Sequence, residues 1–170
     1  MPAVPFETLP DDARLWVFAS SAPLAGGGAE RLLAAVDDFI DGWAAHGTPL
    51  RAARDWRDDR FLAVAVDQSA AGASGCSIDG LFRALRALEP ALGTSLVGAG
   101  RVFWRDAAGH VQVGDRARFA AAAAAGDVTA DTAVFDPSVT TAEAWRSRFE
   151  VPAGQSWHRA LLRQGAASER

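Results

Sequence analysis

The stretch ASGCSID, residues 73–79, holds the single cysteine of the chain and leads into a segment whose apolar residues recur at helical spacing. A thiol at the N-terminus of a helix lies near unpaired backbone amides and the positive end of the helix dipole. Both features favour the thiolate, which is the nucleophilic form of cysteine. Cys76 is therefore the first candidate for a reactive side chain.

Two other residues complete a possible reactive site around this thiol. His46 follows a helix-like segment, and Asp67 directly follows the apolar run FLAVAV at residues 61–66. If the segments 50–57 and 61–66 are antiparallel neighbours, the loop entering the first and the loop leaving the second lie at one end of the sheet. A thiol, an imidazole and a carboxylate then form a nucleophile, base and orienter. The candidate catalytic residues are Cys76, His46 and Asp67.

The same loop allows two other interpretations. Backbone amides at a glycine-rich helix start can bind an anion or another small ligand, although Asp67 and Asp79 oppose an anion. A small residue such as cysteine can also simply pack beneath a turn. A structural cysteine, a ligand-binding loop and a catalytic thiol all stay open, and the candidate ligand-binding residues are Ser74, Gly75, Ser77 and Asp79.

The elements that must position these residues follow the order strand, helix, strand, strand, helix, strand. The helices are expected over residues 28–45 and from Ile78 to Leu92, and the strands over residues 14–20, 50–57, 61–66 and 101–106. This order predicts an α+β fold with a ferredoxin-like βαββαβ core, in which both helices cover one face of an antiparallel sheet and the fourth strand lies beside the first. Strand 61–66 is apolar on both faces and should be central, whereas the charged strand 50–57 should lie at an edge.

The rest of the chain predicts a small C-terminal α/β appendage. It contains an alanine-rich helix near residues 115–127, a strand near 131–136 and a last helix near 156–164. We expect residues 1–106 to form the core and residues 107–170 to pack on it, as one structural unit.

Composition excludes several function classes. All seventeen positive charges are arginine, so the chain has no lysine for a Schiff base or a phosphate-binding loop. The net charge of −4 and the pI of about 5.3 argue against nucleic-acid binding. One cysteine and three scattered histidines lack the spacing of metal ligands, and no metal or cofactor is predicted.

Targeting signals are also missing from the sequence. The N-terminal residues lack the basic and then apolar pattern of a signal peptide, and a single cysteine cannot form an internal disulfide. No apolar run approaches the roughly 20 residues that span a bilayer. We therefore expect a cytoplasmic protein without membrane contact.

Several motifs resemble a family of short uncharacterised bacterial proteins, some of which are labelled ABC transporter ATPase. The motifs are LPDDARLWVF, WAAHGTPL, RFLAVAVDQ, ASGCSID, DTAVFD and SWH, and the resemblance covers nearly the whole chain. The family supplies no functional residues to carry over. ATPase activity is not expected, because the chain has no GxxxxGK[ST] loop. A shorter likeness, from HVQV through DTAVFD, is to the order of elements in GYF-like peptide-binding domains.

Two functions remain from the sequence. The first is binding of an unknown small ligand, or thiol chemistry, at the loop of residues 67–79. The alternative is a non-enzymatic interaction or oligomerisation module, for which a homodimer through the sheet is plausible by analogy with the fold. The sequence leaves open whether the protein is an enzyme.

Overall fold

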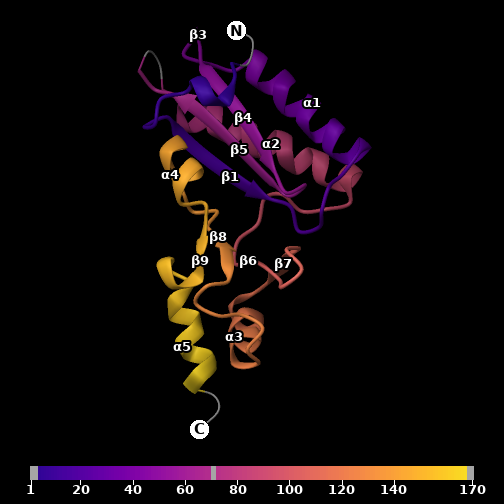
Figure 1. The fold of residues 1–170 in the computed structure, drawn as a ribbon. Coiled ribbons are helices and arrows are strands. Elements are labelled where there is room, and N and C mark those ends of the chain that lie inside the picture. Colours follow the sequence, from indigo (N-terminus) through magenta and orange to yellow (C-terminus); the bar gives the residue numbers. More distant parts are fainter. Residues whose placement is uncertain (1–3, 70–71, 168–170) are drawn as a thin grey trace. The chain divides into compact units, whose positions relative to one another are not determined.

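The computed structural model describes residues 4–69 and 72–167 of the chain (Figure 1). The chain forms two compact units. The first runs to Gly98 and includes Pro137–Arg146, and the second contains Ala99–Asp136 and the chain from Ser147 onward. The boundary expected after residue 106 therefore lies inside the second unit, and the chain returns once to the first.

The first unit is built on a three-stranded antiparallel sheet in the order β1-β5-β4. The strands are β1 (Arg14–Ala19), β5 (Phe61–Asp67) and β4 (Arg51–Arg57). Every residue of β5 is buried, which confirms that this strand is central and β4 is outside it. Three residues join the two strands, and the first two, Asp58 and Asp59, have positive φ angles of 55° and 51°, as a tight turn of this kind requires.

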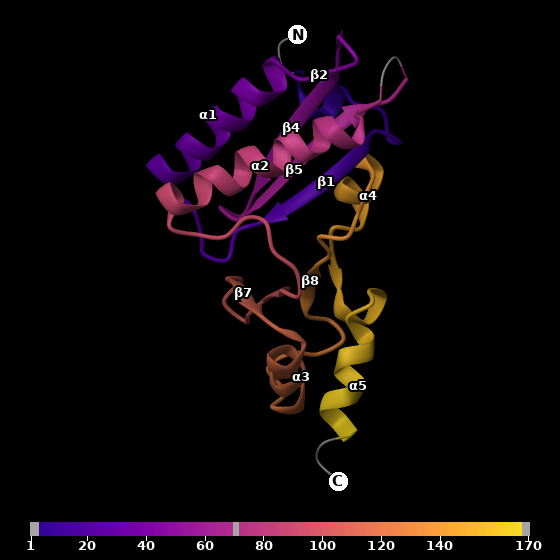
Figure 2. The ribbon, with the colours of Figure 1, turned by 180° about the vertical axis from the view of Figure 1, so that it is seen from behind.

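Two helices cover one face of this sheet, α1 (Gly27–Asp41) and α2 (Gly75–Leu92) (Figure 2). Their apolar stripes pack on alternate residues of the strands, and the buried residues they share include Leu32, Val36, Ile40, Leu62, Val64, Leu81 and Leu85. Helix α1 ends four residues before the expected residue 45. A small hairpin of β2 (Ala44–Ala45) and β3 (Thr48–Pro49) follows it, because His46 and Gly47 adopt positive φ angles of 51° and 80° and turn the chain back.

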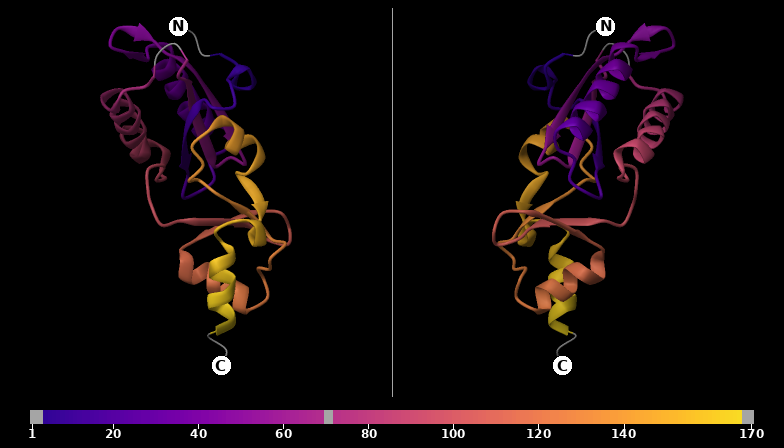
Figure 3. Two further views of the ribbon diagram at one scale, coloured as in Figure 1. Left: turned by 90° about the vertical axis from the view of Figure 1, so that its left-hand side faces the viewer. Right: turned by 90° about the vertical axis from the view of Figure 1, so that its right-hand side faces the viewer.

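The opposite face of the sheet is covered by η1 (Phe6–Thr8) and α4 (Ala142–Ser147). In Figure 3 helices α2 and α4 lie on opposite sides of the sheet. Trp145 of α4 is fully buried, and its indole N–H donates to Asp55 of β4 at 2.7 Å. The guanidinium of Arg57 lies 4.3 Å from the centre of the Trp145 ring. Neither η1 nor α4 was expected from the sequence.

The predicted fourth core strand belongs to a different sheet. Strand β6 (Val102–Arg105) lies in the second unit in the order β7-β6-β8-β9, with β7 (Val111–Gly114), β8 (Ala133–Phe135) and β9 (Glu150–Pro152). The outer edge of β1 is occupied instead by the returning chain, since Leu15 donates its amide to the Thr140 carbonyl at 2.8 Å. A ferredoxin-like core is therefore not confirmed. The protein is an α+β protein with antiparallel sheets.

The second unit adds α3 (Arg116–Ala124), η2 (Ala153–Gln155) and α5 (Arg159–Ala167) to its sheet. Helix α3 begins where Asp115 accepts a hydrogen bond from the Arg118 amide at 2.8 Å. The hydrophobic core of the second unit contains Val102, Trp104, Phe119, Val128, Val134, Ala153 and Leu161. The expected strand and helices of this segment are thus present. None of the helices in residues 4–69 and 72–167 is long and apolar enough to cross a membrane.

Candidate functional site

The first turn of α2 carries the candidate thiol. Ser74 is the N-cap, and its hydroxyl accepts a hydrogen bond from the Ser77 amide at 3.3 Å. The Ser77 hydroxyl in turn donates to the Ser74 carbonyl at 2.9 Å. Cys76 lies between them and is exposed, so its sulfur is not packed beneath the turn. Gly75 and Asp79, the other expected ligand-binding residues, are exposed on the same turn.

Asp67 is engaged with residues other than His46. Its carboxylate forms a salt bridge with Arg51 at 2.8 Å and accepts a hydrogen bond from the Ser69 amide at 2.9 Å. The hydrogen bonds from Ser69, followed by that from Arg51, hold the pKa of Asp67 below its usual value of 3.8. The strand register explains the pair, because Arg51 of β4 lies directly opposite Asp67 of β5.

His46 is exposed at the turn of the β2–β3 hairpin. As expected, this hairpin leads into β4 at the end of the sheet where β5 ends, since β4 and β5 are antiparallel. Within the described part of the chain, however, no hydrogen bond or ion pair joins His46, Cys76 and Asp67. The structure places the three residues at one end of the sheet without connecting them.

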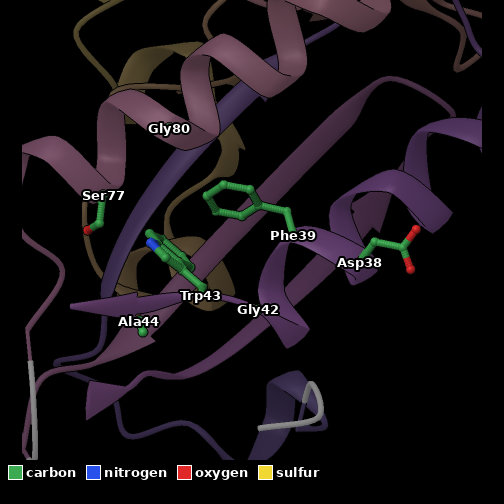
Figure 4. Close-up of a pocket in the computed structure, with 7 residues that line it drawn as sticks. All are labelled: Asp38, Phe39, Gly42, Trp43, Ala44, Ser77 and Gly80. Carbon is green, nitrogen blue, oxygen red and sulfur yellow. The ribbon is translucent and has the colours of Figure 1, made fainter. Parts of the chain in front are cut away.

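A groove of about 380 Å³ lies beside the first turns of α2, where the end of α1 approaches it (Figure 4). We call it the α1–α2 groove, and its lining residues are Asp38, Phe39, Gly42, Trp43, Ala44, Ser77 and Gly80. Its volume is within the range of small-molecule sites, which begins at about 300 Å³. Ser77 is the one residue of the predicted site that lines it.

Two glycines, Gly42 and Gly80, are among the residues that line the α1–α2 groove. A Cβ atom at Gly80 would lie 3.6 Å from Cε2 of Phe39, in van der Waals contact with that ring. A Cβ atom at Gly42 would lie 3.8 Å from the carbonyl oxygen of Asp38. Both distances are ordinary van der Waals contacts, so the packing of α1 against α2 does not require glycine at either position.

Trp43 is a largely buried residue of the α1–α2 groove. Its side chain is only 4% exposed, and its Nε1 atom has no hydrogen-bond partner among the described residues. The ring packs against Phe39, with centroids 5.2 Å apart, and Trp16, with centroids 6.3 Å apart. In Figure 4 the nitrogen of the indole is on the side that faces Ser77. Because Nε1 is itself buried, the contribution of Trp43 to the groove is aromatic surface.

Sequence reasoning assigned Trp43 to the core because it continues the apolar stripe of the expected helix 28–45. That part of the assignment agrees with its burial. The residue nevertheless lies after the end of α1 at Asp41, where the chain turns into the β2–β3 hairpin. A tryptophan placed next to a helix-ending glycine, Gly42, was the available signal for a site at this point.

No family model, no curated protein and no solved structure matches the chain. The resemblance to short bacterial proteins therefore stays a prediction from the quoted motifs. Among residues 4–69 and 72–167, no group of three or more histidine, cysteine, aspartate or glutamate side chains could hold a metal ion.

Proposed function

We propose that this protein binds a small molecule in the α1–α2 groove. The observation that carries the proposal is the groove itself, with a volume of about 380 Å³ and the aromatic residues Phe39 and Trp43 in its lining. Its size and its mixture of aromatic groups with a few polar ones are typical of small-molecule sites.

The other lining groups favour a flat, largely apolar guest. Phe39 and Trp43 offer aromatic surface on one side, and Gly80 of α2 allows close approach on the other. Aromatic and apolar walls with a few placed polar groups are typical of small-molecule sites. The expected loop of residues 67–79 contributes through Ser77, which joins this proposal to the ligand-binding interpretation of the sequence.

The test follows the indole N–H groups of nitrogen-15-labelled protein by NMR. The chain has six tryptophans, and the resonance lost in Trp43→Phe identifies Trp43. Acetophenone, benzamide and benzoate are titrated separately as aromatic probes of similar size. We expect at least one of them to shift the Trp43 resonance in a saturable manner, because an aromatic ring bound beside the indole changes the magnetic field at its proton.

The control variant is Trp157→Phe. Trp157 is 38% exposed in the second unit and does not line the groove, so its replacement should leave the affinity of the probes unchanged. Trp43→Phe should weaken binding of the same probes. If none of the three probes moves the Trp43 resonance, or if Trp43→Phe binds them as tightly as the natural protein does, the proposal is wrong.

A further inference from the structure

The polar side-chain atoms in the lining of the α1–α2 groove are buried, bonded or turned away. Three of the seven lining residues carry such atoms, namely Asp38, Trp43 and Ser77. Nε1 of Trp43 is buried, and the Ser77 hydroxyl donates to the Ser74 carbonyl at 2.9 Å. In Figure 4 the Ser77 oxygen and the Asp38 carboxylate both point away from the Phe39 ring. A guest beside that ring therefore meets little hydrogen-bonding capacity.

The surface that remains is aromatic and aliphatic. The rings of Phe39 and Trp43 are tilted by 54°, with centroids 5.2 Å apart, and Ala44 adds a methyl group to the lining. A further ring can contact such a pair edge to face or offset-stacked. The volume of about 380 Å³ is near the low end of the range for small-molecule sites, about 300–1,000 Å³, so the groove fits one or two fused rings.

The lining also disfavours a charged guest. It contains no arginine, and the chain has no lysine, so an anion would have no cationic partner among the lining residues. Asp38 is the one ionisable residue of the lining, and it is exposed to water, which weakens its attraction for a cation. Moving a charge out of water costs more than an exposed ion pair returns. An uncharged guest is therefore favoured.

We infer that the ligand of the α1–α2 groove is an uncharged arene of one or two rings. It is held by contact with the rings of Phe39 and Trp43 and not by hydrogen bonds from the lining side chains. This inference rests on the proposed function and specifies the chemical class of its ligand.

Five planar probes of similar shape test this class. α-Methylstyrene is a hydrocarbon, and acetophenone and benzamide replace parts of its side group with neutral polar atoms. Benzoate has a negative charge and benzamidinium a positive one. Burial of a polar group without a hydrogen bond weakens binding roughly two- to thirty-fold. We expect α-methylstyrene to bind most tightly, then acetophenone, then benzamide and the two ions, as measured by titration of the Trp43 indole resonance.

Gly80→Ala is the variant that should block the arene. A Cβ atom at this position would lie 3.6 Å from Cε2 of Phe39 and would cover part of the ring that the guest contacts. Alanine is favoured over glycine inside a helix, so α2 should stay folded. We expect the affinity for α-methylstyrene to fall roughly five-fold or more, because the added methyl group competes for the same space.

Ser77→Ala and Asp38→Asn are the matched controls. The first removes the lining hydroxyl but keeps the hydrogen bond from the backbone amide of residue 77 to Ser74, so the helix cap is retained. The second removes the charge of the lining and keeps the shape of the side chain. Both should leave the affinity for α-methylstyrene unchanged, because neither group contacts an arene through a polar atom.

The results separate this inference from the proposed function. Tightest binding of α-methylstyrene, weakened in Gly80→Ala and unchanged in both controls, supports an arene ligand. Benzamide, benzoate or benzamidinium that binds as tightly as the hydrocarbon, or a loss of α-methylstyrene affinity in either control, overturns the arene inference and leaves the proposed function standing. Undiminished binding in Gly80→Ala also overturns the inference. If none of the five probes binds, the proposed function fails and the inference fails with it.

Discussion

Trp145 donates its indole N–H to the carboxylate of Asp55, with 2.7 Å between Nε1 and Oδ2, across ninety positions of sequence. The bond fixes α4 to β4 within the first unit. Trp43, in the same unit, is buried to a similar degree but has no such acceptor among the described residues. The contrast separates a tryptophan that is fixed by its polar atom from one that is held by ring packing against Phe39 and Trp16.

Loss of the Trp145–Asp55 bond should destabilise the protein. We expect Asp55→Ala to lower the free energy of unfolding by about 1–3 kcal/mol, because it removes the acceptor of a buried donor. Urea unfolding followed by tryptophan fluorescence measures the change. Asp37→Ala is the control, since Asp37 forms a partly exposed salt bridge with Arg54 that should contribute less than about 1 kcal/mol. Equal losses in the two variants would contradict this ranking.

His158 should make the stability of the second unit depend on pH. Burial lowers its pKa to about 4 from 6.5, although the charge of Asp136 raises it, and its Nδ1 lies 2.9 Å from the Ser156 hydroxyl. Between these two values the unfolded chain binds a proton that the folded chain does not. Stability is therefore complete above pH 6.5 and falls as the pH drops towards 4, by about 1.4 kcal/mol per unit from this group.

The measurement for His158 compares urea unfolding of the natural protein and His158→Phe between pH 4.5 and 7.5. The unfolding free energy of the natural protein minus that of His158→Phe should decrease as the pH falls, because phenylalanine has no proton to gain. His110→Gln is the control, since the His110 side chain is 78% exposed. A constant difference across this range would show that His158 does not titrate with the unfolding transition.

Cys76 should react with a thiol reagent in the native state, because it is exposed. We expect His46→Ala to leave the labelling rate unchanged at pH 7, since Asp67 is held by Arg51 and Ser69 and does not orient the imidazole. The rate of reaction with N-ethylmaleimide in the two proteins is the measurement. A rate that falls severalfold in His46→Ala, without loss of folding, would favour the reactive thiol that the sequence suggested.

Asp67 should keep a lowered pKa without its salt bridge. The hydrogen bonds from Ser69 are the largest cause of the shift, and Arg51 follows them. In Arg51→Met we expect the pKa to rise only partly and to stay below 3.8. Carbon-13 NMR titration of the Asp67 carboxylate measures it, with Arg83→Met as a control at an exposed position of α2. A return to 3.8 or above would make Arg51 the main cause.

The lowered pKa of Asp67 also predicts how the stability of the protein changes at acid pH. Because the folded carboxylate holds its proton less tightly than the unfolded one, Asp67 stabilises the protein above pH 3.8, and this contribution is lost as the pH falls through the lowered value. Arg51→Met should reduce the size of that contribution. Acid unfolding of the variant and of the natural protein compares the two.

The sequence by itself determined the elements whose signals are local. The continuous apolar run of β5 predicted a strand buried on both faces, and the adjacent aspartates at residues 58 and 59 predicted the tight turn from β4. The apolar stripe from Ile78 to Leu92 predicted α2. Each of these features depends on residue spacing, turn chemistry or burial within a short segment, so it can be recognised without knowledge of the rest of the chain.

Only the tertiary structure decided which segments meet. The pattern of β6 specifies a strand but not its partner, and the returning chain at Thr140 occupies the edge of β1 that a ferredoxin-like core would have given to β6. The partner of Asp67 followed from strand register, which brings Arg51 opposite it. From the sequence, Trp43 was assigned only as an apolar residue of the expected helix 28–45. Its unpaired N–H appears only when the surrounding atoms are placed, because hydrogen bonding depends on position in space and not on residue type.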